Sequence, residues 1–518
     1  MGRRRQTTLM GVLVCAGLLV AACGDDDDGG TAEPAETTAG GETETTAGSE
    51  TTAGAETTAG EEEPEATDAE ATTPEGTEAE PGGGAAGGDE GESARGAEEL
   101  RAALEATADE PLAADDSLEP FVVGVVNIEG DPAGSFPEVT EGAEAAAQLI
   151  NERLGGIGAD VEAGTPGRPV ELVVCRHGAD QNEAQACANE LAAANPNVIV
   201  PGIDFFTPLM YPIFAPFPVV EMQPIFIADF DQPGVYAPFG GCASAFPSSA
   251  QMIAEIKGHD RLAIVWAENA PGTECWQDTQ ERFYQYYADT LDGFEFSGFP
   301  YTPGEQAGYP AVIQQVSDYL QGAENPAIFM GIAAPDCASF IQGLRSAGEE
   351  SAVYTSNSCD DESVRGLPES AGTFFETPGF IVEQPELYSE FTQFMLAERE
   401  AALDAYGPQS PRGSFMRSMF SAVLFVYQVA NAALEDGVDI DDREAFREAI
   451  ATVEDFYLLG YQPVSCAGNV SEYESICQRK TNYSVWDGES YTPDTDITDG
   501  YIDVTDLLLA VEEALPRQ

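Results

Sequence analysis

Polar and aromatic side chains follow the ends of several expected strands, where a folded chain could hold a small molecule. These candidate ligand contacts are Asn127, Glu129, Phe136, Phe205, Phe206, Thr207, Asp229, Phe230, Asp231, Glu268, Asn269, Trp276, Asp336 and Asp360. Aromatic rings beside carboxylates suit an amide, a cationic amine or a hydroxylated apolar solute, through stacking and cation–π contacts. The competing interpretation is structural, with the acids solvated at the surface and the phenylalanines packed in the core.

Motifs for catalysis or metal binding are missing from the sequence. It contains no GxSxG elbow, no phosphate-binding P-loop and no GxGxxG after the first expected strand. Its two histidines, His177 and His259, have no HxxxH partner, and no CxxC occurs. We therefore expect neither an enzyme nor a bound metal or cofactor.

The charge balance excludes nucleic-acid binding. The chain has 92 Asp and Glu against 21 Lys and Arg among 518 residues, a formal net charge of −71. Neutralising phosphates requires clustered Lys and Arg, which such a chain cannot supply.

The first residues are typical of an export signal. Arg3, Arg4 and Arg5 precede an apolar run at 9–22. That run is shorter than the roughly 20 residues that a helix needs to span a bilayer. It ends in small residues before Cys23 and resembles the bacterial lipoprotein box, in which the cysteine is lipidated. We therefore expect a signal peptide at 1–22 and a protein anchored through Cys23 to the outer face of the cell membrane; the alternative is an ordinary signal with an incidental cysteine.

A low-complexity segment rich in Glu, Thr, Ala and Gly follows at 23–118. The pentapeptide Glu-Thr-Thr-Ala-Gly occurs four times between residues 36 and 60. Such an acidic segment has too few large apolar residues to offset chain entropy, so we predict a disordered tether.

From residue 119 onward, short apolar runs alternate with amphipathic stretches, which indicates an α/β fold of βαβ units. The expected strands lie at 121–128, 170–175, 197–201, 224–228, 262–266, 327–331, 352–356 and 372–376. Right-handed crossovers turn such units into doubly wound sheets, and about 400 residues exceed one ordinary core. We therefore expect two lobes, with a ligand in the cleft beyond the carboxyl ends of the strands.

Several segments in order resemble one family. They lie at 122–126, 142–146, 168–173, 198–200 and 483–488. Together they are similar to the type I solute-binding proteins of the branched-chain amino acid (Leu/Ile/Val) family, the extracytoplasmic receptors of ABC importers. The resemblance implies two Rossmann-like lobes joined by a three-stranded hinge, the type I periplasmic binding protein fold. It places lobe one at about 119–241 and 373–455, and lobe two at about 242–372 and 456–518.

The same resemblance implies capture of a small solute, such as an amino acid or amide, by hinge closure and delivery to a permease with its ATPase. A membrane-tethered sensory receptor is the alternative. In the amino acid binders, a Ser or Thr after the third strand and a run of small residues after the fourth hold the ligand carboxylate. Thr207 fits the first role, whereas Asp229 and Asp231 stand where the small residues would be. The amino acid specificity of the family is thus not carried over by these residues.

The cysteines predict four disulfides in an exported chain. Of ten, Cys15 leaves with the signal and Cys23 is the expected anchor, so eight remain. The βα arrangement favours near pairs in the chain. The expected pairs are Cys175 with Cys187, Cys242 with Cys275, Cys337 with Cys359, and Cys466 with Cys477.

Overall fold

The folded part of the chain is described here from a computed structural model. The described residues are 90–130, 135–332, 334–407, 409–410, 412–467, 470–497 and 500–517. All of them belong to the second of two units into which the chain divides, 1–79 and 80–518. The expected signal peptide, the anchor Cys23 and the tether up to residue 89 lie outside the described residues. Within those residues, no helix combines the length and apolarity needed to cross a bilayer.

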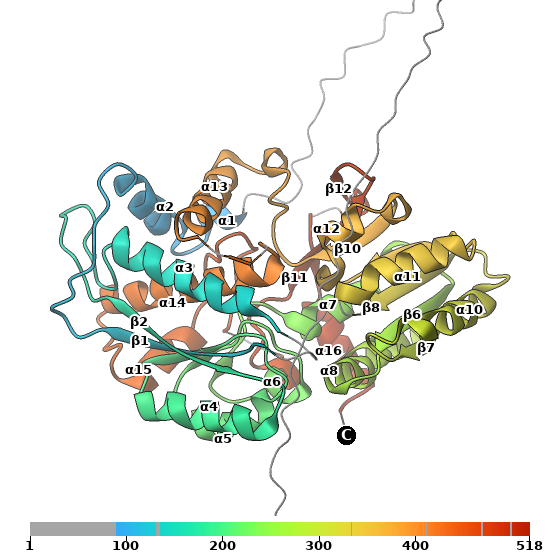
Figure 1. The fold of residues 1–518 in the computed structure, drawn as a ribbon, viewed down its shortest axis with the longest axis horizontal. Helices are drawn as coiled ribbons and strands as arrows, with labels where there is room; N and C mark the ends of the chain where they lie inside the picture. Colours follow the sequence, from blue (N-terminus) through green and yellow to red (C-terminus); the bar gives the residue numbers. More distant parts are fainter. Residues whose placement is uncertain are drawn as a thin grey trace, which may run out of the picture. The chain divides into compact units, whose positions relative to one another are not determined.

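Helices and strands alternate along most of the described chain (Figure 1). The strands are β1 (Phe121–Ile128), β2 (Val170–His177), β3 (Val198–Pro201), β4 (Val219–Val220), β5 (Val235–Tyr236), β6 (Arg261–Ala267), β7 (Glu295–Tyr301), β8 (Pro326–Gly331), β9 (Ala352–Thr355), β10 (Thr373–Thr377), β11 (Lys480–Trp486), β12 (Tyr491–Pro493) and β13 (Ile502–Asp503). The α-helices are α1 (Glu90–Ser93), α2 (Ala97–Ala106), α3 (Pro137–Glu152), α4 (Gln181–Ala194), α5 (Thr207–Phe214), α6 (Ile227–Phe230), α7 (Gly241–Ala250), α8 (Ala270–Glu274), α9 (Glu281–Thr290), α10 (Tyr309–Leu320), α11 (Ala334–Ser346), α12 (Glu362–Arg365), α13 (Glu390–Ala405), α14 (Ser414–Glu435), α15 (Arg443–Ala451) and α16 (Thr505–Ala514). Two π-helical segments, η1 (Gln251–Ile256) and η2 (Cys275–Gln280), continue α7 and α8.

Lobe one is built on a parallel five-stranded sheet in the order β2-β1-β3-β4-β5. Strands β1, β3, β4 and β5 are buried on both faces, as in most parallel sheets, while the edge strand β2 is partly exposed. Val123 and Val125 of β1 pack into the core shared with α3 and α14, while Val126 packs into the opposite core with α4 and α5. In Figure 1, α3 lies on one side of β1 and β2, and α4 and α5 lie on the other. The layers follow directly from the alternation of side chains along the strand.

Lobe two is built on the second sheet, in the order β12-β11-β10-β9-β8-β6-β7, with β13 paired to β11. Strands β6 to β10 run parallel, and β11 to β13 add antiparallel pairs at one side. Leu262 and Ile264 of β6 face one core, and Ala263 and Val265 face the other. The expected pair of doubly wound sheets is confirmed.

Three connections join the lobes, at about 237–241, 377–381 and 461–480. They are bonded to neighbouring segments: Ala237 N donates to Ser475 O at 2.6 Å, and Phe380 N donates to Gly460 O at 2.9 Å. Ala237 pairs in parallel with Ile476, as strands would. These three connections lie where the family resemblance implies a three-stranded hinge, and isolated bridges link their segments.

Two lobe boundaries differ from the expected ones. Strand β10 pairs with β9 of lobe two, so the second crossing follows residue 377 and does not precede 373. Residues 456–464, expected in lobe two, pack into the core of lobe one.

The expected strand at 224–228 is wrong. Its end is the short helix α6, which begins after Phe226 because the carboxylate of Asp229 accepts the backbone N–H groups at its start.

The folded part begins earlier than the expected tether boundary at 118. Helix α2 buries Ala97, Leu100 and Leu104 against the core of lobe one. These side chains recur at helical spacing, and Gly96 before them takes a left-handed conformation with φ of 84°. A short amphipathic stretch inside an acidic segment therefore packs onto the lobe instead of continuing the tether.

All four expected disulfides are present. The bonds, with their Cα–Cα distances, are Cys175–Cys187 (5.5 Å), Cys242–Cys275 (6.2 Å), Cys337–Cys359 (5.6 Å) and Cys466–Cys477 (4.2 Å). The first lies in lobe one, the next two lie in lobe two, and the last closes a loop of the third connection. None of the four ties a sheet of one lobe to a sheet of the other.

A candidate solute-binding pocket beside the hinge

A pocket beside the second connection is lined by both lobes. Its lining residues are Asn357, Asp360, Thr377, Pro378, Gly379, Phe380, Ile381, Val382, Glu383, Arg399, Ser414, Arg417, Gly460, Tyr461 and Tyr491. The space open to the centre of a water molecule is about 60 Å³. One water needs roughly 10–15 Å³ on this measure, so the pocket has room for a small polar group and a few waters.

Arg399 is the most unusual side chain of this pocket. It lies on α13 and is only 2% exposed. Its Nε donates to Glu400 Oε1 at 3.2 Å. Among the residues that the structure describes, neither Nη1 nor Nη2 has a hydrogen-bond acceptor or a carboxylate within ion-pair distance. Burying a guanidinium that is only partly paired lowers the stability of the folded state, because the desolvation free energy is not fully offset. A binding role would explain why an arginine stands at this position.

Arg417, on α14, borders the same space. Its Nε donates to Glu400 Oε1 at 3.1 Å, and its Nη2 donates to Glu400 Oε2 at 3.4 Å. Its Nη1 lies 4.0 Å from Glu383 Oε1, the limit of an ion pair. Arg399 and Arg417 therefore share the carboxylate of Glu400, and Glu383, which also lines the pocket, is a second acid beside Arg417.

Lobe two contributes an acid to the same pocket. Asp360, which follows β9, accepts hydrogen bonds from Arg365 Nη1 at 2.6 Å and from the hydroxyl of Tyr491. Burial raises the pKa of Asp360, although both hydrogen bonds favour its charged form. The pocket thus takes two guanidinium groups and the carboxylate of Glu383 from lobe one, and a hydrogen-bonded carboxylate from lobe two.

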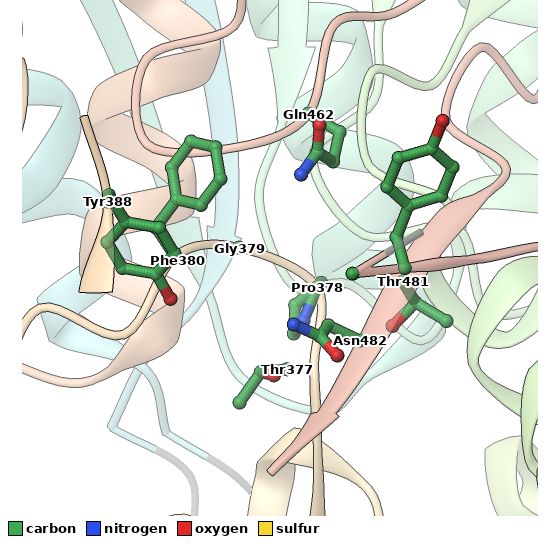
Figure 2. A pocket seen from close by; sticks show the side chains of 10 residues that line it. Thr377, Pro378, Gly379, Phe380, Tyr388, Gln462, Thr481 and Asn482 are labelled. Carbon is green, nitrogen blue, oxygen red and sulfur yellow. The ribbon is translucent and has the colours of Figure 1, made fainter. Parts of the chain in front are cut away.

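A second, smaller pocket lies between the second and third connections. Figure 2 shows Phe380 and Tyr388 together on one side of it, with Gln462, Thr481 and Asn482 around the rest. The two rings lie 4.8 Å apart between centroids. Its open space is about 10 Å³, room for about one water molecule, so it is too small for a solute.

Of the sequence candidates, Asp360 alone lines the pocket among the described residues. Four others gather at the end of β1 instead. The amide nitrogen of Asn127 donates to Phe136 O at 2.7 Å and to Glu129 Oε1 at 3.2 Å. Glu129 also forms an ion pair with Arg176 at 3.2 Å, and Phe136 meets Phe205 edge to face. Phe205 packs against the cores of both lobes.

Thr207 and Asp229 are brought together, but they bind each other. Thr207 Oγ1 donates to Asp229 Oδ1 at 2.8 Å, and Oδ2 accepts the backbone N–H groups of Ile225 and Phe226 at 2.9 and 2.7 Å. Both side chains are buried, and burial raises the pKa of Asp229 to about 6. The hydrogen-bonding capacity of this carboxylate is used inside the protein.

Glu221, which the sequence analysis missed, completes this cluster. The phenol oxygen of Tyr211 lies 2.8 Å from Glu221 Oε2 and 2.7 Å from Asp229 Oδ1. A phenol has one proton to donate, so one of the two carboxyl groups must donate a proton of its own. Asp229 already accepts three other hydrogen bonds, which makes Glu221 the protonated group. Burial and the neighbouring Asp229 raise the pKa of Glu221 well above its usual value.

The remaining candidates are scattered. Phe230 stacks on Tyr473, and Trp276 stacks on Trp266, both in the core of lobe two. Phe206 packs in lobe one beside His177. Asp336 is buried and accepts from the hydroxyls of Tyr301 and Tyr309 at 3.1 and 2.5 Å. Asp231, Glu268 and Asn269 are exposed.

A signal for Arg399 is present in the sequence. Phe391, Met395, Arg399 and Leu403 recur at intervals of four and lie on one face of α13. The other three are buried apolar residues, so an arginine stands at a core position of an amphipathic helix. A base is also rare in this chain, which makes its placement informative.

Two lobes on doubly wound sheets, joined by three connections of the chain, are the architecture of the type I periplasmic binding protein fold. The family model of the periplasmic binding proteins matches residues 121–469, and the chain belongs to this family. Its members are extracytoplasmic solute-binding proteins. No curated protein shows significant similarity to the chain.

Solved structures share the fold at low sequence identity. A leucine-binding protein from Thermotoga maritima is 16% identical, with a TM-score of 0.55, and the match covers 72% of this chain and 97% of that one. A substrate-binding periplasmic protein from Ralstonia solanacearum is 16% identical, with a TM-score of 0.54, covering 73% and 100%. A solute-binding protein of an ABC transporter from R. palustris, in complex with benzoate, is 13% identical, with a TM-score of 0.55, covering 72% and 95%.

Proposed function

We propose that this protein captures a small solute between its lobes and presents it to an ABC permease with its ATPase. The observation that supports this function is the pocket beside the hinge, which takes Arg399 and Arg417 from lobe one and Asn357 and Asp360 from lobe two. Bending at the three connections changes the distance between these two sides. A solute that contacts both sides favours the closed form by its differential affinity for that form.

The solute class we propose is an amino acid, an amide or a related small compound. Similar structures are described as binding leucine or benzoate, which supports a small organic ligand. The function requires no catalytic step and no cofactor. Lipid attachment at Cys23 would keep the receptor close to the permease at the outer face of the cell membrane.

A thermal-shift screen tests this function. Purified protein is melted with amino acids, amides, polyamines and small carboxylates, and hits are checked by calorimetry and small-angle scattering. A ligand at 100 times its dissociation constant stabilises the folded state by roughly 2.7 kcal/mol. Closure of the lobes would also reduce the radius of gyration. A protein whose melting temperature does not change with any of the four classes would contradict the proposal.

A further inference from the structure

The strongest unassigned feature is the buried guanidinium of Arg399, on the lobe-one side of the pocket. Only 2% of this side chain is exposed. Its two terminal nitrogens have no acceptor among the described residues. Buried polar groups in folded proteins are nearly always hydrogen-bonded. An acceptor that comes from outside the chain would complete this group.

The surrounding structure fits the guanidinium closely. Gly460 takes a left-handed conformation with φ of 80°, and a Cβ at this position would overlap Arg399 Nη1. Any residue other than glycine would therefore displace the guanidinium or strain the backbone. On its other side, Glu400 holds the Nε of Arg399 and also the Nε of Arg417. The orientation of the planar group is thus fixed before a ligand arrives.

From this geometry we propose that Arg399 binds the carboxylate of the solute, with Arg417 beside it. A carboxylate presents two oxygens that match the paired N–H groups of a guanidinium, and such bidentate pairs are strong and specific. A neutral carbonyl offers only one oxygen and no charge. The inference rests on the proposed function, because it names the chemical class that the same pocket selects.

The strongly negative net charge of the chain bears on the role of Arg399 as the contact for a carboxylate. With 92 acids against 21 basic residues, the long-range field repels anions from most of the surface. An anionic solute therefore needs a local cationic contact. Arg399 provides one, because Glu383, the acid of lobe one that also lines the pocket, pairs with Arg417 and leaves the terminal nitrogens of Arg399 without a carboxylate. Asp360, across the pocket, would accept from an amino or hydroxyl group of the same solute. The ligand class is a small carboxylate, including those that carry a hydrogen-bond donor.

The test compares acids with their neutral amides. Acetate, lactate, L-leucine and benzoate are each titrated beside the corresponding amide into the wild-type protein by calorimetry. At least one carboxylate should bind, roughly 10- to 100-fold more tightly than its amide, because the charged contact is lost in the amide. Equal affinity for an acid and its amide would overturn the proposal. Binding of amides or amines alone would overturn it too, while leaving solute capture intact.

Variants assign the effect to one side chain. Arg399→Met should reduce the affinity for the preferred carboxylate by the same 10- to 100-fold, and Arg399→Lys should restore part of it. Arg412→Met is the matched control, because Arg412 lies 3.9 Å from Glu400 but does not line the pocket. It should change affinity less than twofold. Full affinity in folded Arg399→Met would refute the assignment; if this variant does not fold, the acid and amide comparison on the wild type still decides.

Discussion

Two polar clusters of lobe one differ in how completely the protein satisfies them. In the first, Thr207, Tyr211, Glu221 and Asp229 bind one another and the backbone, so Asp229 accepts four hydrogen bonds. In the second, Arg399 uses Nε alone, and its terminal nitrogens face a pocket. We call the first the closed cluster and Arg399 with Arg417 and Glu400 the open cluster. Residue type and position after a strand favoured the closed cluster as a site, whereas unused hydrogen-bonding capacity favours the open one.

Removing the carboxylate of the closed cluster should have the largest effect on stability. Asp229→Ala leaves two hydroxyls and two buried backbone N–H groups without their acceptor. We expect the free energy of unfolding to fall by about 3–5 kcal/mol, measured by urea denaturation. Affinity for a solute identified in the screen should change less than twofold while the variant remains folded.

The control for this variant is Asp231→Ala, two residues along the chain and exposed. Its stability should stay within about 0.5 kcal/mol of the wild type. A stable Asp229→Ala protein that has lost solute binding would show that the closed cluster binds the solute and is not a purely structural element.

The protonation of Glu221 predicts a pH dependence. Because its pKa is raised in the folded state, the folded protein keeps a proton that the unfolded chain releases above its own pKa of about 4.3. The contribution of this group to stability therefore falls as pH rises above that value. Glu221→Gln cannot titrate, so its stability relative to the wild type should rise with pH above that value, by at most about 1.4 kcal/mol per pH unit.

Urea denaturation at several pH values measures this gain. Asp229, with a pKa of about 6, contributes a slope of the same sign at the lower end, so the range from pH 6.5 to 8 reports Glu221 most directly. Glu383→Gln is the control, since Glu383 is 45% exposed. A Glu221→Gln variant whose stability runs parallel to that of the wild type over this range would show that Glu221 is not the protonated group.

The smallest expected change concerns the open cluster without ligand. Replacing Arg399 by Met removes a buried charge that the protein pairs incompletely. Since such replacements are often neutral or stabilising, we expect the free energy of unfolding to stay level or to rise by about 1–2 kcal/mol. A loss of more than about 2 kcal/mol in the ligand-free variant would show that Arg399 belongs to the packing of α13 against lobe one.

Much of the fold could be predicted from the sequence, because apolar periodicity and chain order determine it. The apolar run along 121–128 and the near spacing of Cys175 and Cys187 were sufficient for a strand and a disulfide that the structure contains. The candidate site was harder to predict. Whether Asp229 meets a ligand depends on Tyr211 and Thr207, whose contacts with it are set by the packing of α5 against α6. Arg399 is far in sequence from Asp360, and only the crossing of the chain at the hinge brings both to one pocket.

The disulfides have a consequence for how the protein matures. Each bond joins cysteines that are consecutive among the eight of the folded part, although lobe one itself is assembled from distant segments of the chain. In a chain exported with its N-terminus first, the first, third, fifth and seventh cysteines of this set each have their native partner as the next cysteine to emerge. Eight cysteines can pair in 105 ways. Oxidation in order of emergence arrives at the native set without reshuffling, while the lobes that the bonds reinforce are still incomplete.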